Sequence, residues 1–402
     1  MGEISKRGKL DDLVADLASC KITRRKFMKT GLMLGFSATF LGGIIAGHSP
    51  LEAASSTADV PEECLKAVRK EGSKLNVMNW AEFIDTDRVK KFEEEFKIEV
   101  TYDAVANSSI MKTKISAGKS GYDIFYPSDY MVFEMKELNL IQPINHDWIP
   151  NLKTMIEVLL NPTYDPGNKY SSGYNISTTG HAYNKDKVSD KDPKFGSHAI
   201  IFEGKEYKDH IGMLKYTMNL LGPALKYLGH SINTGEPWSE GERQKLMQAK
   251  ELLLKQKPLL AGYFVSTQIK EGLASNELWL ADYYNGETLV AQSRNPKVEF
   301  YLPKEGDVLY AMPICIPSDA SHPAAAHLWM NYVLRPKVQA AIAEFTKYPP
   351  GVTTAGKYLP DDFRKNPAIF PTKEQLKNME YRKPITGKNK EVRSKIMAEV
   401  ML

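Results

Sequence analysis

The sequence predicts an α/β protein built from two lobes. Its 402 residues exceed the roughly 100–200 residues of a typical domain. Its composition, 42% hydrophobic and 25% charged, is that of a globular chain. From residue 74, short segments with strand patterns alternate with segments of helical periodicity, which favours a largely parallel sheet covered by helices. The alternation restarts near Thr179, and this restart indicates the second lobe.

The first half of the chain gives the clearest pattern. Apolar and polar residues alternate over 74–79, which is typical of a half-buried strand. Val89, Phe92 and Phe96 then recur at helical spacing, after a cap at Asp85 or Thr86. The elements that we expect are a helix over 61–71, a strand over 74–79, a helix from about 86, a strand over 98–102, a helix over 109–117, a strand over 122–126 and a helix over 131–138.

The second half repeats this order and then returns to the first lobe. We expect strands over 181–184, 211–214, 278–281 and 298–302, and helices over 217–228, 240–256 and 285–294. The strand at 181–184 is predicted to cross between the lobes, and residues 313–317 and 322–334 are predicted to return. The predicted division is therefore 74–178 plus 309–345 for lobe 1, and 179–308 plus 346–402 for lobe 2. Ligands bind beyond the carboxyl ends of parallel strands, so the turns at 79–84 and 127–130 are expected to line a site.

Residues 1–54 look like a targeting segment rather than part of the fold. TRRKFMK at 23–29 precedes the apolar, glycine-rich GLMLGFSATFLGGIIAG at 31–47, which is shorter than the ~20 residues that span a bilayer. The pattern resembles a twin-arginine signal, with Met28 in place of the usual Leu. We expect export by the twin-arginine translocase and cleavage near residue 54; an uncleaved membrane anchor remains the alternative.

Charge and cysteine content exclude several classes of protein. The net charge of +4 belongs mostly to residues 1–54, so nothing indicates nucleic acid as a partner. Three cysteines are too few for a disulfide scaffold. Whether Cys64 and Cys315 pair stays open, because sequence does not fix the distance between them.

An ordered set of motifs resembles the spermidine/putrescine-binding proteins of bacterial ABC importers. The motifs are NWAEF, GYDIFYPSDY, WLADYYNGETLVAQ, VEFYLPKEG and HLWMNYVLRPKVQAAIAEFTKYPPG, and the resemblance extends from about Lys74 to about Arg382. It implies a type II periplasmic-binding-protein fold, with mixed sheets flanked by helices, two interlobe crossovers and a ligand cleft. It also implies a periplasmic monomer without a cofactor, which delivers its ligand to the permease subunits of an importer.

The resemblance also implies which residues contact the ligand. The aromatic positions of the family's cleft fall on Trp80, Phe83, Tyr130, Trp279 and Tyr348. Phe83 stands where a Tyr is usual. Ser128 matches a serine that contacts the ligand, Asp282 matches a carboxylate that binds an amine, and Glu82 lies where some members have an acid.

The acidic part of this pattern is incomplete. Tyr216 and Asn219 stand where Asp and Glu are usual, and Arg382 stands near a family glutamine. A polyamine needs aromatic faces for its methylenes and a carboxylate or several acceptors for each buried ammonium. Two acids, Asp282 and Glu82, suit a short diamine. A Lys and an Arg nearby instead favour an amino-acid-like or aminophosphonate-like ligand.

Other interpretations of single residues stay open. Trp80, Trp279 and Tyr348 also suit a hydrophobic core, and Asp282 also suits a helix N-cap. Adjacent Tyr283 and Tyr284 suggest a ferric-iron site on the same fold. We find no Cys-x-x-Cys, His-Glu-x-x-His, Gly-x-Ser-x-Gly or phosphate-binding loop, so an exported enzyme is disfavoured. A receptor that presents its ligand to a sensor is not distinguished from an uptake protein.

Overall fold

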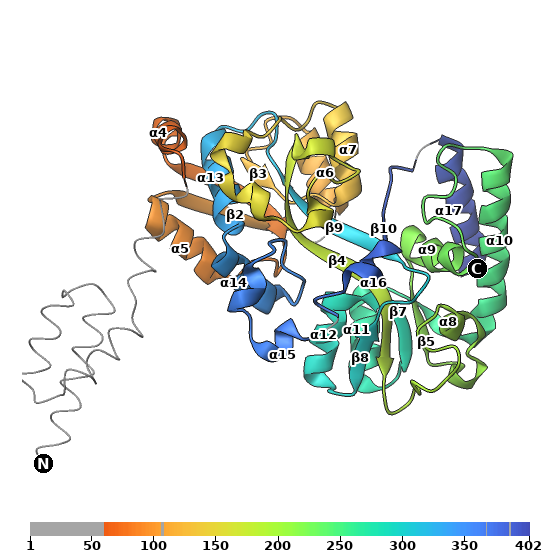
Figure 1. Ribbon diagram of the computed structural model, residues 1–402. Coiled ribbons are helices and arrows are strands. Elements are labelled where there is room, and N and C mark those ends of the chain that lie inside the picture. Colours follow the sequence, from red (N-terminus) through yellow and green to blue (C-terminus); the bar gives the residue numbers. More distant parts are fainter. Residues whose placement is uncertain (1–59, 106–107, 367, 386) are drawn as a thin grey trace, which may run out of the picture. The chain divides into compact units, whose positions relative to one another are not determined.

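The computed structural model describes residues 60–105, 108–366, 368–385 and 387–402 (Figure 1). The predicted twin-arginine leader and its cleavage site lie outside these residues. Within the described part of the chain, every helix is too short or too polar to cross a membrane.

The described strands form one mixed sheet in the order β2-β1-β3-β9-β4-β7-β5-β6, with β10 beside β9 and β8 beside β4. The pairs of β1 with β2 and β3, and of β5 with β6 and β7, are parallel. The strands are β1 (Lys74–Trp80), β2 (Glu99–Val105), β3 (Ile124–Phe125), β4 (Ser171–Asn184), β5 (Ile211–Leu214), β6 (Leu260–Phe264), β7 (Leu280–Tyr284), β8 (Val298–Tyr301), β9 (Val308–Cys315) and β10 (Glu380–Tyr381).

Helices flank this sheet, as the sequence predicts. The Asp85 carboxylate accepts a hydrogen bond from the Arg88 backbone N–H at 3.0 Å and caps α5, and the Ser239 hydroxyl caps α10 in the same way. The α-helices are α4 (Glu62–Glu71), α5 (Thr86–Phe96), α6 (Ser108–Ser116), α7 (Asp129–Glu137), α8 (Ala199–Glu203), α9 (Thr217–Tyr227), α10 (Glu240–Gln256), α11 (Ser266–Ser275), α12 (Asn285–Arg294), α13 (Pro323–Val333), α14 (Pro336–Thr346), α15 (Asp361–Arg364), α16 (Lys373–Lys377) and α17 (Gly387–Met401).

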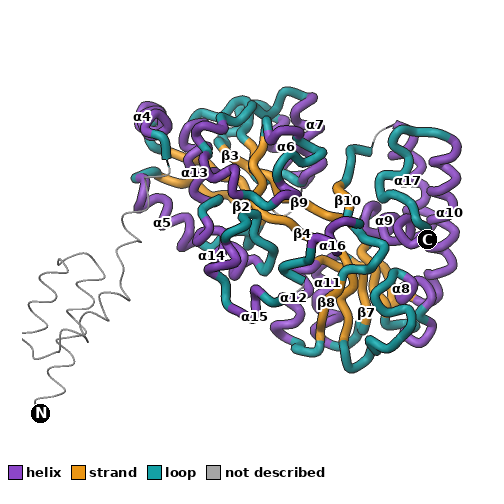
Figure 2. The backbone as a smooth tube through the Cα atoms, in the orientation of Figure 1, coloured by secondary structure: helices purple, strands orange, loops and turns teal. Residues whose placement is uncertain are grey.

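Strands β4 and β9 connect the two halves of the sheet (Figures 1 and 2). β4 pairs with β9 up to Thr178 and with β7 from Thr179 onward. The predicted crossover strand at 181–184 is too short, because β4 begins at Ser171. All fourteen residues of β4 are buried, and a strand covered on both faces does not show the alternation that marks a half-buried one.

Each half of the sheet has its own hydrophobic core. In the first, the ring of Phe92 packs edge-on against Trp329 at 4.8 Å, and the Trp329 indole donates a hydrogen bond to the Tyr126 hydroxyl at 2.7 Å. The second lies between α9, α10 and β5. The C-terminal segment contributes to both, since residues 352–359 pack in the first core and residues 396–400 in the second. The segment 346–402 therefore belongs partly to each core, whereas the sequence assigns all of it to lobe 2.

Several elements differ from the predicted order. β6, β10, α8, α11 and the four helices from α14 to α17 have no predicted counterpart, and β9 starts at Val308 rather than at 313. β6 consists of LAGYF, a run too short for its period to separate a strand from a turn. Cys64 and Cys315 are both buried and unpaired, which answers the open question of a bridge. Burial raises the pKa of the Cys64 thiol to about 12.

Candidate functional site

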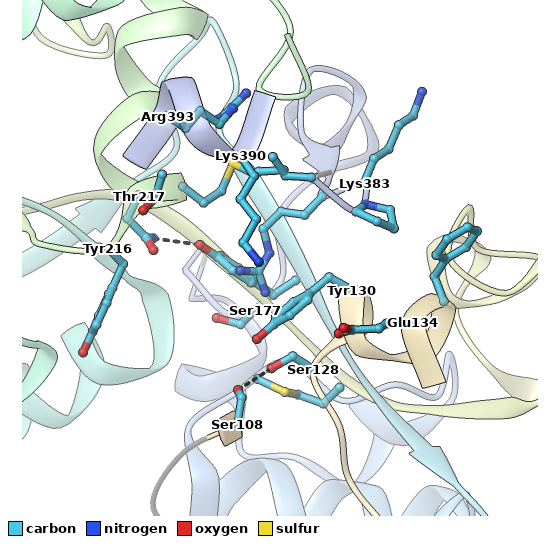
Figure 3. Close-up of a pocket in the computed structure, with 18 of the residues that line it drawn as sticks. Ser108, Ser128, Tyr130, Glu134, Ser177, Tyr216, Thr217, Lys383, Lys390 and Arg393 are labelled. Atoms are coloured by element: carbon cyan, nitrogen blue, oxygen red, sulfur yellow. Dashed lines mark hydrogen bonds between the residues drawn. The ribbon is translucent and has the colours of Figure 1, made fainter. Parts of the chain in front are cut away.

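A cavity of about 1110 Å³ lies beyond the carboxyl ends of the parallel strands (Figure 3). Residues at or just after the ends of six strands line it, as expected where strands lead into helices. They are Trp80 after β1, Ser108 after β2, Ser128 after β3, Tyr216 after β5, Ser266 after β6 and Tyr284 at the end of β7. The two turns that the sequence singled out, 79–84 and 127–130, both contribute to this lining.

Eight aromatic side chains of the described residues line the cavity, namely Phe133, Tyr216 and the six described next. The ring of Phe83 lies 5.6 Å from that of Tyr348 and 6.5 Å from that of Trp80. The ring of Tyr284 lies 5.7 Å from that of Tyr310. We call the six the aromatic cage: Trp80, Phe83, Tyr130, Tyr284, Tyr310 and Tyr348. Such faces attract a cation and pack against methylene groups.

Two serines place hydroxyl groups at the first turn of α7. Ser128 is the N-cap residue of α7, yet its side chain makes no hydrogen bond to the helix. Its Oγ lies instead 3.2 Å from the Oγ of Ser108 (Figure 3). Both hydroxyls can therefore turn toward a ligand at little cost to the helix.

Arg382 lines the cavity with its charge already partnered. Its guanidinium lies 4.7 Å from the ring centres of both Tyr130 and Tyr310, and it forms a 3.1 Å ion pair with the buried Asp129. Burial raises the pKa of the Asp129 carboxyl, while Arg382 and the backbone N–H of Tyr130 act in the opposite direction. The ion pair with Asp129 holds the Arg382 guanidinium against the rings of Tyr130 and Tyr310.

Glu287 is the acid that accompanies the aromatic cage. It lies in the first turn of α12, where the ring of Tyr348 packs so closely over Gly286 that a Cβ there would lie 2.5 Å from the ring. Glu287 forms a 2.8 Å ion pair with Lys270. The cavity's other acids, Glu134 and Glu137, pair with Lys112 and Lys136.

Of the ten residues proposed from the sequence, seven line the cavity: Trp80, Phe83, Ser128, Tyr130, Tyr216, Tyr348 and Arg382. Glu82 does not, because it lies exposed in the turn after β1, with a φ of 60°. Trp279 does not either. It stacks on His210 at 3.6 Å, at the opposite end of β7 from Tyr284, and the five residue steps from 279 to 284 correspond to ~16 Å of strand.

Asp282 is likewise displaced from the site. It is fully buried in β7 and does not line the cavity. Burial and the neighbouring Asp307 raise its pKa well above the usual range, which favours the uncharged form. The N-cap interpretation is also wrong, since Tyr284 holds that position on α12.

The sequence contains a pattern that identifies the residues that line the cavity instead of Trp279 and Asp282. Trp279 and Asp282 were assigned as an aromatic residue followed by an acid three positions later. Tyr284 and Glu287 repeat that spacing five residues further on, and both line the cavity. Choosing between the two pairs of residues requires knowing where β7 ends. The sequence predicts its end at 281, whereas the structure has it at Tyr284.

The two adjacent tyrosines do not form a paired phenolate site. Tyr284 lines the cavity, whereas Tyr283 is buried and its hydroxyl donates to the Ser266 carbonyl at 2.6 Å. Consecutive strand residues point to opposite faces of a sheet. Burial raises the pKa of both phenols, which opposes the phenolate form that would bind ferric iron.

The family model of bacterial extracellular solute-binding proteins matches residues 87–372. The chain belongs to this family. It is 29% identical over 323 residues to the putrescine-binding periplasmic protein SpuD of Pseudomonas aeruginosa, covering 76% of this chain and 85% of that protein. It is 28% identical over 327 residues to the spermidine/putrescine-binding periplasmic protein 1 of Haemophilus influenzae, covering 81% and 88%. These relatives are binding proteins rather than enzymes.

Solved structures of this family share the fold. The spermidine/putrescine ABC transporter substrate-binding protein PotD of Streptococcus pneumoniae superposes with a TM-score of 0.76 at 27% identity, over 82% of this chain and 98% of that one. The Tp0655 (TpPotD) lipoprotein of Treponema pallidum gives a TM-score of 0.71 at 26% identity, over 81% and 99%. The fold is the predicted type II periplasmic-binding-protein fold, and β4 and β9 are its crossovers.

Proposed function

We propose that the protein is the extracytoplasmic solute-binding component of an ABC importer and that it binds a small cationic solute such as putrescine or spermidine. The observation that supports this best is the aromatic cage with Glu287 beside it. Relatives named as putrescine-binding or spermidine/putrescine-binding proteins align with this chain over most of their length, and they support the same class of solute.

The physical chemistry of the cavity suits an amine. A linear amine has apolar methylenes, which pack on aromatic faces, and an ammonium, which gains ~0.5–2 kcal/mol from each ring it faces. An ammonium that leaves water needs a carboxylate, because an unpaired buried charge costs several kcal/mol. Glu287 supplies that carboxylate beside Tyr284 and Tyr348. A ligand ammonium has to share it with Lys270 or displace Lys270 from it.

We further propose two lobes that close on the solute, with the division after Thr178 where β4 changes partner. Residues 74–178, 309–345 and 352–359 then form one lobe, and 179–308 with α17 the other. The closed monomer delivers its solute to the permease subunits. Closure predicts a ligand-dependent decrease in the radius of gyration, measurable by small-angle X-ray scattering.

Replacing the cage tryptophan tests where the solute binds. We expect Trp80→Ala to weaken putrescine or spermidine binding about 10-fold, in line with the ~0.5–2 kcal/mol of a cation–π contact plus lost packing. Trp279→Ala is the matched control. It removes the same side chain outside the cavity and should leave the affinity unchanged in isothermal titration calorimetry. A loss confined to Trp279→Ala would place the site at the other end of β7.

Export by the twin-arginine route is proposed from the leader motif alone. We expect Arg24→Lys combined with Arg25→Lys to retain the protein in the cytoplasm, because the translocase recognises the arginine pair. Cell fractionation followed by immunoblotting measures this. Lys21→Arg, which keeps the charge and lies before the motif, is the control. Unimpaired export of the double variant would contradict the assignment.

A further inference from the structure

A positively charged wall of the cavity comes from the end of the chain. The family model stops at residue 372, whereas α17 begins at Gly387. Lys390 and Arg393 of α17 both line the cavity, and we call them the basic wall. Lys390 extends from α17 toward Tyr130, while the side chain of Lys383 turns away (Figure 3).

The charges of the basic wall are not held in ion pairs with the described carboxylates. Arg393 is 1% exposed and donates to the Asn389 side chain and to the backbone carbonyls of Ile232 and Thr234. Its Nη1 is buried with no hydrogen-bond partner. Among the described residues, neither Arg393 nor Lys390 forms an ion pair. Burial lowers the pKa of Arg393 to about 10, and the Glu236 carboxylate acts in the opposite direction.

The cavity's acids do not offset this charge, because each is already paired. Glu134, Glu137 and Glu287 are bound to Lys112, Lys136 and Lys270 respectively. Asp129 is committed to Arg382. A solute with several ammonium groups would therefore enter a cavity whose uncompensated charge is positive.

The first turn of α9 adds a second anion-binding element beside the basic wall. Residues 216–219 line the cavity, and this turn has no acidic residue and no side-chain cap. Its N–H groups are thus free for an anion. The resemblance implied acids at Tyr216 and Asn219. Instead Asn219 donates to the Tyr310 hydroxyl and accepts from the Tyr284 hydroxyl, so its amide is occupied.

From these observations we propose that the solute is a linear aliphatic amine that also bears a carboxylate. This rests on the proposed amine binding at Glu287 and changes only the other end of the solute, where a carboxylate replaces the second ammonium of putrescine. The ammonium lies in the aromatic cage at Glu287, and the carboxylate binds the first turn of α9 and Lys390. Arg393, behind them, adds to the positive potential at that end of the cavity, although Glu236 offsets part of its charge.

The test compares two solutes that share four methylenes and one ammonium. Putrescine has a second ammonium where 5-aminopentanoate has a carboxylate. Isothermal titration calorimetry of the exported protein should show that 5-aminopentanoate binds at least 10-fold more tightly. Lys390→Gln should weaken 5-aminopentanoate at least 10-fold and strengthen putrescine at least 2-fold, because it removes a positive charge from the cavity.

Lys388→Gln is the matched control. Lys388 is exposed on the same helix and does not line the cavity, so neither affinity should change. Tighter binding of putrescine or spermidine than of 5-aminopentanoate, or no effect of Lys390→Gln, would overturn the carboxylate proposal and leave amine binding intact. If neither putrescine, spermidine nor 5-aminopentanoate binds, the proposed function itself fails.

Discussion

Glu287→Gln should reduce the affinity for an amine by roughly 30- to 150-fold, or ~2–3 kcal/mol, the lower part of the range for truncating one partner of a buried charge pair. Its side chain is 27% exposed, and its carboxylate acts on the Tyr348 phenol of the aromatic cage. The amide keeps the shape of the side chain and removes only its charge. Isothermal titration calorimetry with putrescine and with 5-aminopentanoate measures the loss.

Asp282→Asn is the control for this substitution. It makes the same chemical change at the acid that sequence reasoning preferred. Asp282 is buried and does not line the cavity, and its raised pKa favours a protonated carboxyl, which an amide closely resembles. We therefore expect unchanged affinity. A loss in Asp282→Asn without one in Glu287→Gln would show that Asp282 is the amine-binding carboxylate.

Arg382→Met should lower the free energy of unfolding by about 3–5 kcal/mol, the usual cost of removing one partner of a buried ion pair. Asp129 is fully buried, and Arg382 is its cation. The methionine keeps much of the apolar volume between Tyr130 and Tyr310. Urea denaturation followed by fluorescence measures the change.

The double variant Asp129→Asn with Arg382→Met separates charge from packing. Without the carboxylate, no unpaired buried charge remains, so we expect the double variant to recover most of the lost stability. If the double variant is as unstable as Arg382→Met alone, the loss arises from packing and the ion pair contributes little.

The penalty in Arg382→Met should also depend on pH. Arg382 is the largest influence that lowers the Asp129 pKa, so its removal raises that pKa further above the ~3.9 of an unfolded aspartate. A protein with a carboxyl whose pKa is higher in the folded state becomes less stable as the pH rises from the unfolded-state pKa to the folded-state pKa of that group. The penalty relative to the wild type should therefore be larger at pH 7 than at pH 5, and the double variant should not show this difference.

The sequence by itself determined the fold class and two of the strand-to-helix turns that line the site. The alternating pattern over 74–79, the cap at Asp85 and the helix at 240–256 are local signals, and the structure confirms each. Because ligands bind beyond the carboxyl ends of parallel strands, the same pattern predicted that the turns at 79–84 and 127–130 line a site. The family resemblance then selected Trp80, Phe83, Ser128 and Tyr130 within these turns.

Only the tertiary structure decided which acid and which cations belong to that cavity. Whether Asp282 or Glu287 faces the site depends on where β7 ends, since one turn of helix or a few residues of strand moves a side chain from the cavity to the core. Lys390 and Arg393 reach the site because α17, the last helix of the chain, packs beside α9. Such a contact between distant segments leaves no local pattern in the sequence, so the charge of the site, unlike its aromatic lining, emerged only from the folded chain.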